Sequence, residues 1–157
     1  MKKKILITLG ILFALIVTSA TGFAVAKATG LTGLKSKPSD YSIGISYEEA
    51  LKSDKPTVAL FYVDWCGYCL KFMPKFKVLS MMYITKYNFV MLNVEDPANQ
   101  ALVEDVALTG FPTVYILDPK YDNRFLLNNA IYQNMPKMKE ELNRYLRIHG
   151  LLDKASK

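Results

Sequence analysis

The sequence predicts an α/β domain with a central mixed sheet and helices on both of its faces. Short apolar runs rich in β-branched and aromatic residues alternate with segments of helical periodicity, and only a short turn separates the last two runs. Crossover helices join parallel strands and tight turns join antiparallel ones, so a mixed sheet is expected. The expected strands are residues 57–63, 88–94, 113–117 and 124–127. The expected helices are residues 46–52, 67–86, 97–108 and 135–148.

The first half of the domain is expected to run from a short helix through a buried strand into a longer helix. Ser46 and Glu49 have the spacing of a capping box, in which each side chain bonds the backbone N–H of the other residue. Residues 57–63 (TVALFYV) are almost all apolar, which is typical of a strand buried on both faces. The next helix has apolar residues at three- and four-residue steps, and Pro74 inside it predicts a kink.

The second half continues the alternation and closes with a hairpin and a helix. Residues 88–94 (NFVMLNV) form a second apolar run, and Pro97 suits the first turn of the following helix. Residues 118–123 (DPKYDN) have the composition of a turn between the last two strands. The closing helix is amphipathic, and Gly150 is expected to end it. His149 is expected to be exposed and to have no catalytic role.

The first 26 residues have the pattern of an export signal. Three lysines at positions 2–4 precede an apolar run at residues 5–17 and an A-x-A sequence, so one interpretation is a secretory signal peptide cleaved after Ala26. The 22 residues 5–26 carry no charge and are long enough to span a bilayer as an uncleaved anchor instead. In both cases the lysines favour a cytoplasmic N-terminus. The rest of the chain is therefore expected outside the cytoplasm, in the periplasm or on the outer face of the membrane.

After residues 1–26, the chain is expected to contain one domain. Residues 27–44 are rich in Gly, Ser, Thr, Lys and Pro, which is typical of a linker. Residues 45–150 provide enough chain for one hydrophobic core, and residues 151–157 are expected to form a C-terminal tail. The protein is expected to be a monomer.

Charge and cysteine content exclude two classes of function. The net charge is +6, but four of the 20 basic residues and none of the 14 acidic ones lie in residues 1–27. The remainder, with 16 basic and 14 acidic residues, is nearly neutral, so no nucleic-acid binding is expected. A structural zinc site needs four Cys or His ligands, and the chain has two cysteines and one histidine, so no metal or other cofactor is expected.

Cys66 and Cys69 are the candidate catalytic residues, and they are expected to form a redox-active disulfide. Cys66 stands where a buried strand ends and a helix begins, and the free amide groups and dipole of a helix N-terminus stabilise a thiolate. A thiolate attacks disulfides, and a second cysteine one helical turn later can resolve the mixed disulfide. Cys66 is therefore expected to be the accessible nucleophile and Cys69 the more buried resolving thiol.

Three motifs in this chain resemble the thioredoxin family. Residues 64–69 (DWCGYC) are similar to the family's redox motif, and Pro74 lies five residues after the second cysteine, where thioredoxins carry a proline in their helix. Residues 110–113 (GFPT) are similar to the segment that holds the family's cis-proline. The resemblance covers about residues 45–149. It implies a thioredoxin-like fold and thiol–disulfide oxidoreductase activity on protein disulfides or dithiols.

The resemblance also implies substrate contacts. The Phe111–Pro112 bond is expected to be cis, with the Phe111 backbone pairing with an extended substrate segment. Trp65, Gly67 and Tyr68 are expected to complete the substrate-binding surface. The exported single-domain layout is similar to that of membrane-tethered or periplasmic thioredoxin-like reductases, which implies a membrane redox partner. The match at Trp65 and Phe111-Pro112 favours a reductase over an oxidase or isomerase.

The chain departs from ordinary thioredoxins beside the second cysteine. Leu60 stands where the family usually buries an Asp, and Met91 where a Lys often accompanies that Asp. The joint replacement is physically consistent, because one buried charge left alone is costly. It removes the usual proton acceptor for Cys69, for which Glu95 and water are the alternatives. The dipeptide between the cysteines is Gly-Tyr rather than Gly-Pro, which indicates a less reducing potential.

Two other functions fit the same features. The domain could be a non-catalytic binding or chaperone module whose cysteines are idle, or an accessory protein for metal or haem maturation. A trapped mixed disulfide would distinguish disulfide exchange from binding. Stoichiometric metal binding by the reduced pair would indicate the accessory role.

Overall fold

The computed structural model describes residues 35–106 and 108–156, and residues 36–157 form one compact unit. The signal peptide or anchor expected at residues 1–26 lies outside the described part, as do residues 27–34 of the expected linker. Among the helices of the described residues, none is long and apolar enough to cross a bilayer.

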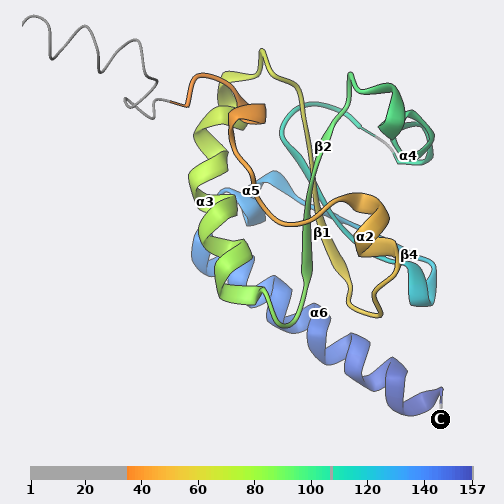
Figure 1. The fold of residues 1–157 in the computed structure, drawn as a ribbon. Coiled ribbons are helices and arrows are strands. Elements are labelled where there is room, and N and C mark those ends of the chain that lie inside the picture. The colour runs from red at the N-terminus through yellow and green to blue at the C-terminus, as the bar shows by residue number, and fades with distance from the viewer. Residues whose placement is uncertain (1–34, 107, 157) are drawn as a thin grey trace, which may run out of the picture. The chain divides into compact units, whose positions relative to one another are not determined.

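Four strands form one mixed sheet in the order β2-β1-β3-β4 (Figure 1). They are β1 (Thr57–Tyr62), β2 (Asn88–Asn93), β3 (Thr113–Asp118) and β4 (Asn123–Leu127). β1 pairs in parallel with β2 and antiparallel with β3, and β3 pairs antiparallel with β4. The mixed sheet is thus confirmed, and each strand differs from the expected range by one residue at one end.

Helices cover both faces of this sheet (Figure 1). The face that carries the longer helices is covered by α3 (Gly67–Tyr83), α5 (Asn129–Tyr132) and α6 (Met135–Ala155). The opposite face is covered by α2 (Tyr47–Leu51) and α4 (Gln100–Asp105). Three single turns of 3-10 helix are η1 (Pro38–Asp40), η2 (Pro97–Asn99) and η3 (Pro119–Tyr121).

The central strand β1 is buried on both faces. Val58 and Leu60 pack in the apolar cluster under α3 and α6, whereas Ala59 and Phe61 pack in the cluster under α2 and α4. All four side chains are fully buried. Covering both faces explains why the strand is an almost continuous apolar run rather than an alternating one.

The expected start of α2 is confirmed, but two other short helices differ from the expectation. Ser46 and Glu49 form the expected capping box. The helix expected at residues 97–108 is one 3-10 turn followed by α4, which ends at Asp105 because Val106 adopts an extended conformation. The short helix α5 was not expected from the sequence.

The closing helix α6 does not end at Gly150 as expected, but continues to Ala155. Glycine in a helix interior costs about 1 kcal/mol relative to alanine. Contacts hold the additional turn: Lys120 Nζ and the Tyr121 hydroxyl each donate to Asp153 Oδ1 at 2.5 Å. Residues expected to form a tail therefore extend the helix.

Residues 36–44, which were expected to belong to the linker, pack against the domain. Ile43 is buried in the core, and the backbone N–H of Ile45 donates to the Phe89 carbonyl at 2.9 Å, at the outer edge of β2. Gly44 has a φ of 79°, and a Cβ at this position would overlap the Phe89 carbonyl. Glycine is therefore required where the chain passes this edge.

The expectation that His149 is exposed was wrong. Its side chain is 12% exposed, and its Nδ1 lies 2.7 Å from Oδ2 of Asp118, a residue that is itself buried. The Tyr145 hydroxyl donates to the same Oδ2 at 3.1 Å. These three side chains join α6 to the end of β3. No local pattern marks this contact in the sequence, because Asp118 has the appearance of an ordinary turn residue.

Candidate redox site

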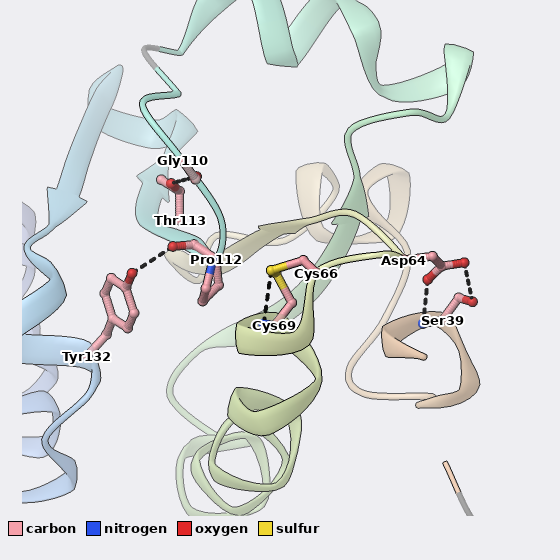
Figure 2. The surroundings of a disulfide bond; sticks show 8 residues. All are labelled: Ser39, Asp64, Cys66, Cys69, Gly110, Pro112, Thr113 and Tyr132. Atoms are coloured by element: carbon pink, nitrogen blue, oxygen red, sulfur yellow. Dashed lines mark hydrogen bonds between the residues drawn. A yellow bond between two sulfur atoms is a disulfide. The ribbon is translucent and has the colours of Figure 1, made fainter. Parts of the chain in front are cut away.

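Cys66 and Cys69 lie at the junction of β1 and α3, joined in a disulfide with their Cα atoms 5.2 Å apart (Figure 2). The backbone N–H of Cys66 donates to the Val63 carbonyl at 3.2 Å, which closes the turn between strand and helix. Cys66 is the N-cap of α3. It is 7% exposed whereas Cys69 is fully buried, so the expected order of burial is confirmed.

The first turn of α3 favours a negative charge on the Cys66 sulfur. Cys66 Sγ accepts the backbone N–H of Cys69 at 3.1 Å. It lies where the unpaired amide groups and the positive end of the helix dipole are found. This environment stabilises a thiolate. α3 is 17 residues long and contains Pro74 without ending there, so one long helix supports the cysteines.

A second loop faces the disulfide and carries Pro112 (Figure 2). The Phe111–Pro112 bond is cis, as expected. Two hydrogen bonds hold this loop: Thr113 Oγ1 donates to the Gly110 carbonyl at 2.6 Å, and the Tyr132 hydroxyl donates to the Pro112 carbonyl at 2.6 Å. Burial raises the pKa of Tyr132 further above neutral, which favours the protonated hydroxyl that donates this bond.

Exposed aromatic rings surround the redox turn. Trp65 is 72% exposed and Tyr68 is 74% exposed. The Trp65 ring meets Phe111 edge-on with ring centroids 6.3 Å apart, and its Nε1 donates to Glu95 Oε1 at 2.9 Å. Lys71 Nζ lies 5.8 Å from the centre of the Tyr68 ring. The rings form an apolar rim beside Cys66 on which a protein segment could rest.

The structure thus brings most of the sequence-predicted residues to one place. Trp65 and Cys66 meet the Phe111–Pro112 loop, although about 45 residues of chain separate these two loops. Gly67 and Tyr68 follow in the first turn of α3. A Cβ at Gly67 would find no neighbouring atom within 4 Å, so the surface next to Cys66 is open.

The interior beside Cys69 is apolar. Leu60 is fully buried in the same cluster as Cys69, and Met91 packs against that cluster. Glu95, one of the two alternatives for a proton acceptor, accepts the Trp65 indole N–H instead. Among the described residues no hydrogen bond joins Glu95 to Cys69.

Asp64, two residues before Cys66, has partners that sequence reasoning missed. Its carboxylate accepts the backbone N–H of Ser39 at 3.0 Å and the Ser39 hydroxyl at 2.7 Å, and Lys37 Nζ lies 3.5 Å away. Burial opposes ionisation, but the hydrogen bonds from Ser39 and the charge of Lys37 outweigh it, so the pKa of Asp64 is lowered. Lys37 and Ser39 were missed because their segment was interpreted as linker, and Tyr132 because α5 was not expected.

The described residues contain no cluster of metal-binding side chains. No set of three or more His, Cys, Asp or Glu side chains within residues 35–106 and 108–156 is arranged to hold a metal ion. The two sulfur atoms of the pair are bonded to each other.

Comparison with known proteins agrees with this geometry. A family model described as thioredoxin matches residues 42–143, a range that contains both the cysteine pair and the cis-proline loop. The chain belongs to the thioredoxin family. The family and the fold expected from the three motifs are therefore confirmed.

Curated relatives of this thioredoxin-family chain match it over part of their length. The chloroplastic thioredoxin-like protein HCF164 of Arabidopsis thaliana is 39% identical over 74 residues, which cover 47% of this chain and 28% of the relative. The thiol:disulfide interchange protein TxlA of Synechococcus elongatus is 32% identical over 72 residues, which cover 46% of this chain and 38% of the relative. The matched segment thus spans less than half of either relative.

Solved structures show the same thioredoxin fold. The germline-specific thioredoxin Deadhead of Drosophila melanogaster superposes with a TM-score of 0.53 at 22% identity, covering 65% of this chain and 99% of that one. Thioredoxin f from spinach chloroplast superposes with a TM-score of 0.52 at 22% identity, covering 67% of this chain and 85% of that one. At this identity the likeness concerns the fold.

Proposed function

We propose that this protein is an extracytoplasmic thiol–disulfide oxidoreductase that exchanges disulfides with other proteins through Cys66 and Cys69. The observation that carries the proposal is the hydrogen bond from the Cys69 N–H to Cys66 Sγ at the N-terminus of α3. This hydrogen bond stabilises a thiolate on Cys66, the more exposed cysteine. The buried Cys69 sulfur is bonded to the Cys66 sulfur, so it is in place for the second step. A merely structural disulfide would gain little here, because so short a loop is cheap to close.

In the reductase direction, the exchange has two steps. The Cys66 thiolate attacks one sulfur of the substrate disulfide, the substrate S–S bond breaks, and its other sulfur leaves as a thiolate that takes a proton from water. Cys69 then loses its proton to water and its sulfur attacks Cys66 Sγ. The mixed disulfide breaks, and the second substrate sulfur leaves as a thiolate that also takes a proton from water. The substrate gains two electrons and two protons, and the cysteine pair is oxidised to the disulfide seen in the structure.

The substrate is a protein segment that lies across the two loops of the site. An extended segment pairs with the backbone of Phe111, because main-chain hydrogen bonds recognise a strand without regard to its sequence. Trp65, Tyr68 and Pro112 provide the apolar contacts, and the open surface at Gly67 admits the substrate sulfur. Reduction is favoured over oxidation or isomerisation because Trp65 and the Phe111-Pro112 segment follow thioredoxin.

The proposed location and redox partner rest on the N-terminal segment. The lysines before the apolar residues 5–26 favour export of the rest of the chain. If this segment stays in the membrane, the nine residues 27–35 reach at most about 30 Å. The described chain enters the domain beside the redox turn, where Ser39 bonds Asp64. A membrane-embedded dithiol protein is therefore the proposed source of electrons for a monomeric domain.

Reduction of insulin disulfides tests the activity. The full-length reduced protein should precipitate insulin in the presence of dithiothreitol, whereas Cys66→Ser should lose this activity almost completely. Alkylation of the reduced wild-type pair should have the same effect, which controls for the substitution itself. Undiminished activity in Cys66→Ser would rule the proposal out.

The location is tested separately, by labelling intact cells with a membrane-impermeant maleimide after mild reduction. Labelling of Cys66 is expected to be as strong in intact cells as in lysed ones. Labelling that requires lysis would contradict an extracytoplasmic location and leave the exchange chemistry untouched.

A further inference from the structure

The Asp64 carboxylate is held by two residues from the segment that leads into the domain. Its Oδ1 accepts the Ser39 backbone N–H at 3.0 Å, and its Oδ2 accepts the Ser39 hydroxyl at 2.7 Å. Lys37 Nζ lies 3.5 Å from the same Oδ2. Figure 2 shows Ser39 and Asp64 on the side of the redox turn opposite to Pro112. We call Lys37, Ser39 and Asp64 the Asp64 cluster.

The segment that supplies Ser39 is shaped by its own hydrogen bonds. Asp40 Oδ2 accepts the backbone N–H of Ser36 at 2.8 Å, the Ser36 hydroxyl at 3.1 Å and the backbone N–H of Lys37 at 3.1 Å. The intervening Pro38 is buried. Ser39 is therefore presented to Asp64 by a turn that is already closed, which lowers the entropy lost in making the contact.

Asp64 stands two residues before the attacking Cys66 in the chain. It belongs to the turn that the hydrogen bond from Cys66 N–H to the Val63 carbonyl closes, and only Trp65 separates it from Cys66. We expect a carboxylate in the same turn to oppose formation of a second negative charge on the Cys66 sulfur. Hydrogen-bond donors and a cation on that carboxylate offset part of its charge.

We propose that Ser39 and Lys37 are positioning residues of the redox site. They hold the Asp64 carboxylate and offset part of its negative charge, so that this charge opposes the Cys66 thiolate less. This proposal rests on the proposed role of Cys66 as the attacking thiol. It makes the segment that enters the domain part of the redox site rather than a passive connection.

The test is the pH dependence of Cys66 alkylation in the full-length reduced protein. Iodoacetamide reacts with the thiolate, and mass spectrometry assigns the product to Cys66. Ser39→Ala and Lys37→Gln should each raise the midpoint pH of alkylation by about 0.3, because the charge of Asp64 is then less compensated. Asp64→Asn should lower the midpoint by a similar amount, because the opposing charge is gone.

Matched variants separate this electrostatic role from a merely structural one. Ser42→Ala, in the same segment but without a hydrogen bond to Asp64, should leave the midpoint unchanged, and Ser39→Thr, which keeps the hydroxyl, should restore the wild-type value. A purely structural contact would move all three cluster variants in the same direction, since each removes the same link. The proposal would be overturned if the midpoints of all three cluster variants shifted in the same direction, or if none of them shifted.

The measurement is independent of turnover. If the midpoints shift as stated but insulin is not reduced, the oxidoreductase proposal fails and only the effect of the Asp64 cluster on the Cys66 thiolate stands. If insulin is reduced and the midpoints do not shift, only the role of the cluster fails.

Discussion

The indole Nε1 of Trp65 donates a hydrogen bond to Glu95 Oε1 at 2.9 Å, across 30 residues of sequence. Most of the Trp65 surface is exposed, so packing alone does not fix its ring. The bond to Glu95 and the edge-on contact with Phe111 hold the ring over the approach to Cys66. The carboxylate of Glu95 therefore positions the aromatic ring for which we propose a contact with the substrate.

Replacing Glu95 with Leu is expected to weaken substrate binding more than chemistry. Loss of one hydrogen bond of about 1 kcal/mol should raise KM for a protein disulfide by about fivefold and leave kcat within about twofold. Steady-state kinetics measure both, and the fluorescence of Trp65, the one tryptophan of the chain, reports the released ring. Glu104→Leu, at another exposed position, is the control. An unchanged KM and spectrum would show that Glu95 does not position the ring.

The hydroxyl of Tyr132 is expected to support the cis-proline loop. Tyr132→Phe removes its bond to the Pro112 carbonyl and should lower the free energy of unfolding by about 1 kcal/mol. Tyr87→Phe is a matched control, because the buried Tyr87 hydroxyl donates to the Leu142 carbonyl at 2.8 Å, away from the cysteines. Urea denaturation should show similar losses for both variants, while only Tyr132→Phe raises KM, by about threefold. Equal effects on KM would contradict a specific role for Tyr132.

His149 is expected to contribute to stability through Asp118. Asp118 Oδ1 is buried and has no hydrogen-bond partner among the described residues, so its carboxylate depends on the groups at Oδ2. His149→Ala should lower the free energy of unfolding by about 1–2 kcal/mol, measured by urea denaturation. Lys154→Ala, at an exposed position of the same helix, should change it by less than about 0.5 kcal/mol. A loss no larger than that of the control would show that the His149 contact is dispensable.

The contact between Ser39 and Asp64 is expected to depend on pH in the acid range. Because the pKa of Asp64 is lowered from its ordinary value of 3.8, the contact stabilises the fold above pH 3.8 and is lost as the pH falls through the lower value of the folded state. The backbone amide of Ser39, followed by NMR, should titrate with a midpoint below 3.8. The amide of Ser42 serves as the control. A midpoint at or above the ordinary value would contradict the contact.

The sheet and the redox turn could be predicted from the sequence because both depend on local pattern. Residues 58–63 are apolar without interruption, as a strand covered on both faces requires. The position of Cys66 follows directly, since the strand must end and the helix must begin within a few residues. Pro112 was found through its resemblance to a family motif, not through periodicity.

The missed features are contacts between segments that lie far apart in the sequence. Ser39 and Asp64 are separated by 25 residues, and Tyr132 and Pro112 by 20. Such hydrogen bonds depend on how the layers pack, and no local pattern marks them. The length of α6 was missed for the same reason: its last turn is held by residues of η3, which outweigh the local tendency of Gly150 to end a helix.

Capture of the mixed disulfide tests the central claim most directly. Cys69→Ser keeps the attacking thiol and removes the resolving one, so a reduced Cys69→Ser protein incubated with a disulfide-bonded protein should accumulate a covalent complex. Non-reducing electrophoresis should show the complex, mass spectrometry should locate its bond at Cys66, and dithiothreitol should release it. Absence of the complex, with the variant folded and Cys66 reduced, would contradict disulfide exchange through this pair and favour a domain that only binds its partners.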